Sequence, residues 1–440
     1  MSTTKMLVKH SRRLKLLIIT QFYPPDYAAT GQLIAELAIQ LGRLGLPIQV
    51  FTGQPSYAFQ TKSAPKIEHL GQVVIRRCTL LRTAWLPPVV RTWFEKILGK
   101  AVNGLLFFLR SALHLLDASS RGEVLLLTTA PPFLPILGYF ANLILGLPYV
   151  CLLYDLYPDI AVELGLISAD HWSVRLWDAI NRRIWKRAQQ IIVLSATMKH
   201  RVAAKCPEVI DKIGVIHSWA DPAWILPIAK EDNWFAKQFN LVDTFTVLYS
   251  GNMGRCHDMD TIFEVVKLLQ QKPIQFVFIG SGAKRQVFQS KAKKLGLRNC
   301  QFLPYQDKKN LPYSLTACDL SLVSVSEGME GLVAPSKLYG ALAAGRPVAI
   351  ICESHSYLQG ILNEAACGKA FSNGDAAGLA AFILHLAANP DLVKLMGKAG
   401  RDYMQCHFTP ELIAQQYSQL LFKKTNTISV GGVTHKEVSV

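Results

Sequence analysis

The sequence has 440 residues, of which 50% are hydrophobic, and its formal net charge at pH 7 is +16. This length predicts two domains, and nine scattered cysteines without a CxxC pair argue against a disulfide framework or a zinc knuckle and for a reducing cytoplasm. The positive charge favours an anionic partner. Because neither an RNA-binding aromatic motif nor a DNA-binding helix pair is present, phosphate-bearing substrates and anionic lipid are favoured over nucleic acid.

The first half alternates predicted strands and helices. After a basic tail over residues 1–13, in which no signal peptide is apparent, LKLLIIT reads as an apolar strand and GQLIAELAIQLGRLG as a helix with apolar residues at helical spacing. Further strands are PIQVFT, VVIRRC, VLLLTT, YVCLLYD, IIVLSA and KIGVIH. This alternation predicts a parallel sheet with helices on both faces over residues 14–220.

The stretch Val124–Tyr154 carries no charge, which is compatible with a membrane span. Pro131-Pro132 and Gly146 to Pro148 divide it, however, into strand VLLLTT, helix FLPILGYFANLIL and strand YVCLLYD. Strands buried on both faces of a parallel sheet are continuous apolar runs. We therefore favour two buried strands and a helix over a membrane span.

The second half repeats the pattern after a linker at residues 221–243. Its predicted strands are TVLYSG, IQFVFIGSG, NCQFLPYQ and LSLVSVS, and PSKLYGALAAG, RPVAIIC, HSYLQGILNEA and KAFSNGD complete a domain over 244–390. Helices over 391–424 are expected to cross back to the first domain, and 425–440 to be a disordered tail. The predicted fold class is α/β, with two doubly wound, Rossmann-like domains that bind ligand in a cleft at their C-terminal strand ends.

A glycine-rich acidic loop leads into Pro335-Ser336-Lys337 at a predicted helix start. Ser336 can cap this helix, but Lys337 in its first turn opposes the helix dipole. A phosphate between the lysine and the free N–H groups would explain this arrangement. The alternative is an ordinary cap with a solvent-facing lysine.

The segment SGNMGRCHDMD follows the first strand of the second half. Gly251 and Gly254 would let the backbone approach an oxyanion, and Arg255 adds a cation with bidentate geometry. A simple turn is the alternative, and His257 taken alone favours a structural or capping role.

Two positions in the first half also follow strands. Gly31 begins a helix and can direct N–H groups into the cleft, with a plain turn as the alternative. Asp155 ends a buried strand, where its carboxylate can touch a hydroxyl or, alternatively, cap a helix.

Five segments together carry a family resemblance: FYPPDYAATG, DLYPDIAVELGLI, VIHSWADP, LYSGNMGRCHD and GLVAPSKLYGALAAGRPV. They resemble the family-4 (group 1) retaining glycosyltransferases of the GT-B fold, and most closely their colanic acid biosynthesis subgroup. The resemblance implies an acceptor-binding first domain and a second domain that binds a nucleotide-diphospho-sugar. It also implies a role in cell-surface polysaccharide biosynthesis.

The resemblance implies roles for the residues already singled out. Gly31 would lie beside the diphosphate, and the phosphates would be bound by Gly251, Asn252, Met253, Gly254 and Ser336. The loop of Glu327, Gly328, Glu330, Gly331 and Leu332 would face the sugar and nucleoside. The expected catalytic residues are Asp155, which would orient the acceptor hydroxyl, and Arg255 and Lys337, which would stabilise the departing diphosphate.

The sequence departs from the family pattern in the second domain. Asn252 and His257 stand where the family often has arginine and lysine, so Arg255 and Lys337 would supply the charge. Gly340 stands where the family has a ribose-binding glutamate, which leaves Glu330 as the candidate replacement.

The expected reaction moves a sugar from a UDP- or GDP-sugar to a saccharide or polyprenyl-diphosphate-linked acceptor, with retention. No DxD pair stands on a suitable loop, so we expect no metal and no cofactor beyond the donor. Two alternatives stay open: a nucleotide-sugar 2-epimerase of the same fold, and a partner subunit that has lost catalysis.

The segment Trp93–Leu116 is amphipathic, with Glu95, Lys96, Gly99, Lys100 and Asn103 on one side and apolar residues on the other. Such a helix can lie in a membrane interface, and a core helix is the alternative. We expect a cytoplasmic protein that attaches peripherally to the inner face of the cell membrane.

Overall fold

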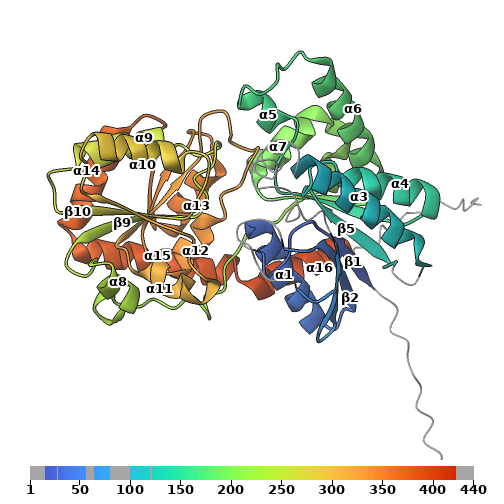
Figure 1. Cartoon of the computed structure of the whole chain (residues 1–440), viewed down its shortest axis with the longest axis horizontal. Coiled ribbons are helices and arrows are strands. Elements are labelled where there is room, and N and C mark those ends of the chain that lie inside the picture. The colour runs from blue at the N-terminus through green and yellow to red at the C-terminus, as the bar shows by residue number, and fades with distance from the viewer. Residues whose placement is uncertain (1–14, 27, 56–63, 80–99, 119–120, 423–440) are drawn as a thin grey trace, which may run out of the picture.

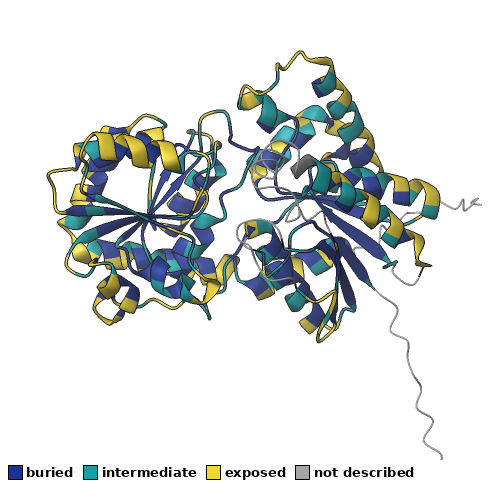
Figure 2. Cartoon of the chain, in the orientation of Figure 1, coloured by how far each residue is buried: buried dark blue, intermediate teal, exposed yellow. Residues whose placement is uncertain are grey.

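The computed structural model of the chain describes residues 15–26, 28–55, 64–79, 100–118 and 121–422. It contains two α/β domains side by side, each built around a central sheet (Figure 1). The strands of both sheets are mainly buried, and the helices around them are exposed on their outer faces (Figure 2). The predicted α/β class with two Rossmann-like domains is confirmed.

The N-terminal domain has an eight-stranded sheet with the order β3-β4-β2-β1-β5-β6-β7-β8. All neighbours are parallel except β3 and β4. The strands are β1 (Leu16–Ile19), β2 (Ile48–Gly53), β3 (Ile67–Leu70), β4 (Val73–Cys78), β5 (Val124–Thr128), β6 (Tyr149–Leu153), β7 (Gln190–Val193) and β8 (Ile213–Val215). The helices are α1 (Ala29–Arg43), α3 (Lys100–Leu116), α4 (Pro135–Leu145), α5 (Asp159–Glu163), α6 (Trp172–Arg187), α7 (Ala196–Lys205) and the 3-10 helix η4 (Pro207–Lys212).

The uncharged stretch Val124–Tyr154 forms β5, α4 and β6, as the sequence predicts. Every residue of the two strands is buried, because helices cover the sheet on both sides. Of the described helices, none on its own has the length and hydropathy to span a membrane, and one sharply bent pair, Ala376–Ala387 with Pro390–Leu421, meets that criterion only when taken together.

The C-terminal domain has a six-stranded, wholly parallel sheet with the order β11-β10-β9-β12-β13-β14. Its strands are β9 (Phe245–Ser250), β10 (Ile274–Ile279), β11 (Cys300–Leu303), β12 (Leu320–Ser324), β13 (Val348–Ile351) and β14 (Gly368–Phe371). Its helices are α8 (Trp234–Gln238), α9 (Asp260–Leu268), α10 (Arg285–Lys294), α11 (Leu311–Thr316), α12 (Lys337–Ala343), α13 (Tyr357–Ala365), α14 (Ala376–Ala387) and α15 (Pro390–His407), with the 3-10 helices η5 (Lys230–Asp232) and η6 (Lys308–Asn310).

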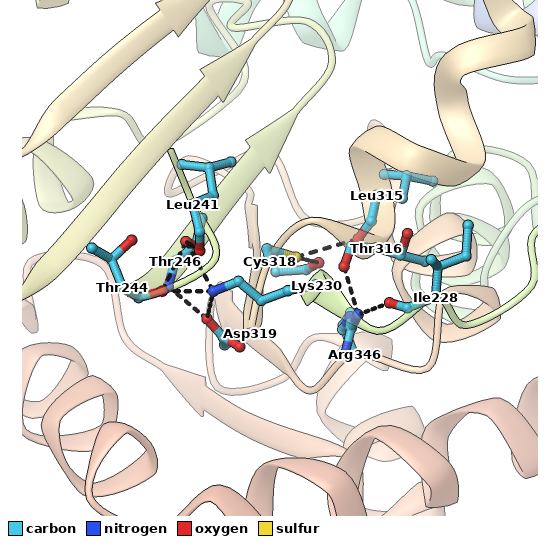
Figure 3. Close-up of polar contacts among 11 residues, drawn as sticks. Ile228, Lys230, Leu241, Thr244, Thr246, Leu315, Thr316, Cys318, Asp319 and Arg346 are labelled. Atoms are coloured by element: carbon cyan, nitrogen blue, oxygen red, sulfur yellow. Dashed lines mark hydrogen bonds and ion pairs between the residues drawn. The ribbon is translucent and has the colours of Figure 1, made fainter. Parts of the chain in front are cut away.

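The segment that joins the domains is anchored to the base of the C-terminal domain (Figure 3). The buried ammonium of Lys230 forms an ion pair with Asp319 at 2.7 Å and donates to the backbone oxygen of Thr244 at 2.6 Å. Arg346 donates to the backbone oxygen of Ile228 at 2.7 Å. The chain from Ile228 onwards is therefore fixed to the second domain, although it lies within the linker predicted at 221–243.

The last helix, α16 (Pro410–Leu421), packs against α1 of the N-terminal domain. Gln40 donates to Glu411 at 3.0 Å, and the ring of Tyr417 meets that of Trp219 edge-on at 6.3 Å. The chain thus returns to its first domain after completing the second.

Candidate functional site

The loop after β9 is held by close backbone packing. Gly251 has a φ of +131°, and a Cβ atom there would lie 2.9 Å from Cε of Lys337. Gly280 and Gly282, after β10, also have positive φ, and a Cβ on either would collide with the backbone oxygen of Gly251 or Met253. Only glycine suits these positions, so the two loops form one surface at the C-terminal strand ends.

Met253 anchors this surface from the inside of the domain. Its backbone N–H donates to the oxygen of Ser281 at 2.7 Å, and its side chain is fully buried in the core. The N–H groups of Asn252 and Gly254 have no acceptor within the described part of the chain. Of the residues predicted to bind phosphate here, these two present free donors, whereas the N–H of Met253 is already occupied.

Lys337 lies beneath the same loop. Its Nζ atom is 3.2 Å from Nε2 of His257 and 5.1 Å from the ring centre of Tyr249. The Nδ1 atom of His257 lies 2.8 Å from the oxygen of Ser324. Burial lowers the pKa of Lys337 to about 7, so this lysine is not the solvent-facing side chain of the alternative interpretation.

Ser336 and Arg255 are two further residues predicted to act on the diphosphate together with Lys337. Ser336 precedes α12 but its side chain makes no capping hydrogen bond, so the predicted cap is not formed in this structure. Arg255 is exposed and makes no ion pair among the described residues. It is therefore a free cation next to the donors of Asn252 and Gly254.

Asp155 approaches this loop from the other domain. It follows β6 and forms an isolated bridge with Val333 of the C-terminal domain. Burial raises the pKa of Asp155 to about 6. Burial and, second, the charge of Asp155 raise the pKa of the Cys256 thiol, which places this carboxylate near the loop that carries Arg255.

The acidic loop, residues 327–333, docks on the N-terminal domain. Thr197 donates its hydroxyl to Glu330 Oε1 at 2.6 Å, and Arg201 Nε donates to the backbone oxygen of Glu330 at 3.1 Å. Glu330 is only 2% exposed. Gly331 has a φ of +75° and lies against the backbone of Thr197. The carboxylate proposed to replace the family's ribose ligand is thus engaged across the domain interface.

The other members of the acidic loop lie in two environments. Leu332 is buried, and its backbone oxygen accepts from the N–H of Leu156 at 3.1 Å. Gly328 has a φ of +79° and donates its N–H to Glu353 at 3.1 Å. Glu327 is exposed and lines a cavity of about 670 Å³ formed by C-terminal domain residues alone. The Glu327 side chain therefore faces a cavity of the C-terminal domain, although the oxygen of the next residue, Gly328, accepts from Arg201 of the N-terminal domain at 3.3 Å.

The first loop of the N-terminal domain, which joins β1 to α1, is held by Arg77. Its guanidinium forms an ion pair with Glu68 at 2.8 Å, donates to the backbone oxygen of Pro24 at 2.9 Å and lies over the ring of Tyr23. Gly31 is buried in the first turn of α1, and a Cβ there would lie 2.9 Å from the backbone of Phe22. Gly31 thus allows α1 to begin directly against this loop.

Two family profiles match the chain, one in each domain. The profile described as "Glycosyl transferase 4-like domain" matches residues 29–217, and that described as "Glycosyl transferases group 1" matches residues 230–403. The chain belongs to the group 1 glycosyltransferases. The family resemblance seen in the sequence is confirmed.

Curated relatives of this glycosyltransferase include two bacterial proteins. It is 26% identical over 312 residues to the probable glycosyltransferase WbjE of Pseudomonas aeruginosa, covering 70% of this chain and 76% of the relative. It is 26% identical over 355 residues to the putative colanic acid biosynthesis glycosyl transferase WcaI of Escherichia coli K12, covering 78% of this chain and 85% of the relative.

Solved structures confirm the fold of this glycosyltransferase. Sucrose-phosphate synthase from Thermosynechococcus elongatus superposes with a TM-score of 0.71 at 18% identity, covering 93% of this chain and 98% of that one. Anabaena HepE in complex with UDP-glucose superposes with a TM-score of 0.64 at 14% identity, covering 92% of this chain and 99% of that one. WaaG, a glycosyltransferase involved in lipopolysaccharide biosynthesis, superposes with a TM-score of 0.66 at 14% identity and with the same coverage as HepE. These likenesses establish the GT-B architecture.

The structure of this glycosyltransferase also adds residues that sequence reasoning missed. Glu353 holds the acidic loop through the N–H groups of Gly328 and Glu330. Thr197 and Arg201 fix the same loop from the other domain, and Arg77 fixes the first loop. No local motif marks these side chains, because each acts on a segment far away in the sequence.

Gly340 lies on α12 where the family has its ribose-binding glutamate. It is half-buried, and a Cβ there would lie 3.3 Å from Cδ1 of Leu315. A glutamate at this position would therefore require Leu315 to move.

Proposed function

We propose that this group 1 glycosyltransferase moves a sugar from a UDP- or GDP-sugar to a saccharide or polyprenyl-diphosphate-linked acceptor in cell-surface polysaccharide biosynthesis. The donor class is supported by the neighbours of the same fold, whose structures contain UDP or UDP-glucose. The pathway is supported by the named role of WcaI in colanic acid biosynthesis and of WaaG in lipopolysaccharide biosynthesis.

One observation carries the proposal: groups suited to both substrates meet at the domain interface. The C-terminal domain contributes Arg255, Lys337 and the free N–H groups of Asn252 and Gly254. The N-terminal domain contributes Asp155, whose charge reaches Cys256 in the same loop. Cations and amide donors suit a departing diphosphate, and a carboxylate suits an incoming hydroxyl.

In the proposed mechanism, Arg255 and Lys337 stabilise the negative charge that develops on the diphosphate as the glycosidic bond breaks. The acceptor hydroxyl approaches from the same face of the sugar and passes its proton to the leaving diphosphate, which retains the anomeric configuration. Before transfer, Asp155 accepts a hydrogen bond from that hydroxyl and orients it; as the glycosidic bond breaks, the same proton moves to the diphosphate oxygen. This scheme uses neither a metal ion nor a covalent carboxylate intermediate.

We further propose that transfer takes place at the cytoplasmic face of the cell membrane. A polyprenyl-diphosphate acceptor would be presented there. The net charge of +16 supports this proposal, since the cytoplasmic leaflet is anionic.

Incubation of the protein with UDP- and GDP-sugars and a polyprenyl-diphosphate saccharide, with and without a chelator, tests the proposal. We expect an extended lipid-linked product with retained configuration, formed equally well in the chelator. Free isomerised nucleotide-sugar would instead indicate an epimerase, and binding without turnover would indicate a partner subunit. Loss of transfer in chelator that manganese restores would refute the metal-free mechanism.

A further inference from the structure

The outward face of α3 is apolar. Leu105, Leu109, Leu113 and Leu116 recur at helical spacing, and each is at least half exposed. The opposite face of the helix carries the buried side chain of Phe107, which stacks on Phe51 of β2. The helix therefore has an ordinary core face and a second apolar face that is at least half exposed.

The apolar face continues onto α4, which packs beside α3 (Figure 1). The ring of Phe108 lies 5.9 Å from that of Phe133, just before α4. On the outward side of α4, Phe140, Leu143 and Ile144 are 48%, 54% and 73% exposed. Apolar clusters of this kind on a surface mark interaction sites.

A basic surface borders this patch on α6, the next helix. Arg187 ties the two helices by donating to Asn142 of α4 at 2.6 Å. Arg183, one turn before Arg187 on α6, and Arg110 of α3 are exposed and have no ion-pair partner among the described residues. Asp178 is the only acidic residue in the three helices, and it pairs at 2.7 Å with Lys205, which also pairs with Asp159.

We propose that the outward faces of α3, α4 and α6 form the surface through which this protein docks on an anionic lipid bilayer. Leucine and phenylalanine side chains would enter the headgroup boundary, and the unpaired arginines would contact lipid phosphates. A second copy of the chain is a poorer occupant, because a two-fold contact through this face would bring two sets of unpaired arginines together. The inference deepens the proposed membrane attachment by naming the face that makes it.

Co-sedimentation of the full-length protein with vesicles tests the proposal. Vesicles of phosphatidylcholine with phosphatidylglycerol should bind the protein, less so as salt rises, and vesicles of phosphatidylcholine alone should bind it weakly. The double variant Arg110→Gln/Arg183→Gln should lower partitioning about 25-fold, since each basic residue near such a surface contributes ~1 kcal/mol, or about fivefold. The triple variant Leu109→Gln/Leu113→Gln/Leu143→Gln should lower it about tenfold or more.

Matched control variants lie on exposed helices of the C-terminal domain. Leu268→Gln/Leu395→Gln and Lys293→Gln/Lys294→Gln remove side chains of the same kinds and should bind vesicles as the unsubstituted protein does. All these variants should keep their melting temperature, because exposed substitutions change stability little.

Three results would overturn the proposal. They are no binding to phosphatidylglycerol vesicles, an equal loss of vesicle binding in the control variants, or a protein that is a dimer in solution and becomes a monomer in the triple leucine variant. Transfer to a soluble acceptor, measured in parallel, keeps this test separate from that of the proposed reaction. The docking variants should retain that activity whether or not they bind vesicles.

Discussion

The ammonium of Lys337 and the imidazole of His257 face each other at 3.2 Å. The backbone oxygen of Ser324 only accepts hydrogen bonds, so the imidazole nitrogen beside it, Nδ1, carries the proton. The other nitrogen, Nε2, therefore presents its lone pair to Lys337. Burial and the charge of Lys337 lower the pKa of His257 to about 3, which keeps the imidazole neutral. Where the family often has a second cation, this protein has a neutral acceptor that positions the remaining one.

This pair predicts how UDP binding depends on pH. Burial lowers the pKa of Lys337 to about 7 in the free protein, and a bound diphosphate would raise it. Protein that has lost this proton must regain it to bind, so affinity should fall by up to about tenfold per pH unit above pH 7. Calorimetry with UDP across pH 6.5–9 measures this slope.

Lys337→Met should abolish that alkaline decline and lower transfer about 100-fold, the usual scale for the loss of one electrostatic contact in a transition state. The melting temperature near pH 6 should not fall, because the substitution removes a buried cation. A Lys337→Met variant with near-normal transfer would remove Lys337 from the mechanism.

The raised pKa of Asp155 predicts that the rate of transfer falls at acidic pH. Its folded-state pKa of about 6 lies above its usual 3.8, so the carboxylate is lost as pH falls through 6. We expect kcat/KM to fall about tenfold per pH unit below 6. In Asp155→Asn this decline should be absent and transfer near pH 7.5 should be about 100-fold lower.

The stability of Asp155→Asn is the control for misfolding. Because the raised pKa means that the folded state holds this proton more tightly than the unfolded chain does, Asp155 costs stability as pH rises from about 4 through 6. The variant should therefore melt at an equal or higher temperature at pH 8. A variant that is inactive and also less stable there would contradict a specific role for Asp155.

Arg255 should act through both charge and shape. Arg255→Ala should lower transfer by roughly 100-fold, and Arg255→Lys should recover only part of it, because lysine cannot bind a phosphate in bidentate fashion. Arg298→Ala is the matched control, since Arg298 is also exposed but precedes β11 at the opposite strand ends. Equal losses in Arg255→Ala and Arg298→Ala would argue against a local role.

Lys230 should contribute to stability and not to chemistry. Removing one partner of a buried ion pair leaves the other uncompensated, so Lys230→Met should lower the free energy of unfolding by about 3 kcal/mol. Urea denaturation measures this change. The exposed Lys272→Met should change it by less than ~0.5 kcal/mol, and a similar effect of both substitutions would contradict the anchoring role of Lys230.

The strands that the sequence predicts most clearly are those buried on both faces, such as β5 and β6, because their apolar runs carry a strong signal. β3 was missed because its residues Ile67–Leu70 form an exposed edge without alternation. Helix α14 was missed because AAGLAAFILHLA is rich in small residues and its apolar residues do not gather on one face.

The local parts of the site were also predictable, and its long-range parts were not. Gly251 and Lys337 stand in motifs that mark a strand end and a helix start. The contact between Glu330 and Thr197 joins residues 133 positions apart in different domains, so no sequence spacing reveals it. The occupied N–H of Met253 depends in the same way on the neighbouring β10 loop.

The position of α16 has a consequence for how the protein is made. Residues Pro410–Leu421 are synthesised after both sheets, yet they cover α1 and pack Tyr417 near Trp219 in the domain that is synthesised first. The N-terminal domain therefore keeps the apolar surface that α16 covers exposed until this helix has been synthesised. A fragment that stops at the end of the first sheet would lack this cover and should require the separate α16 peptide to become soluble.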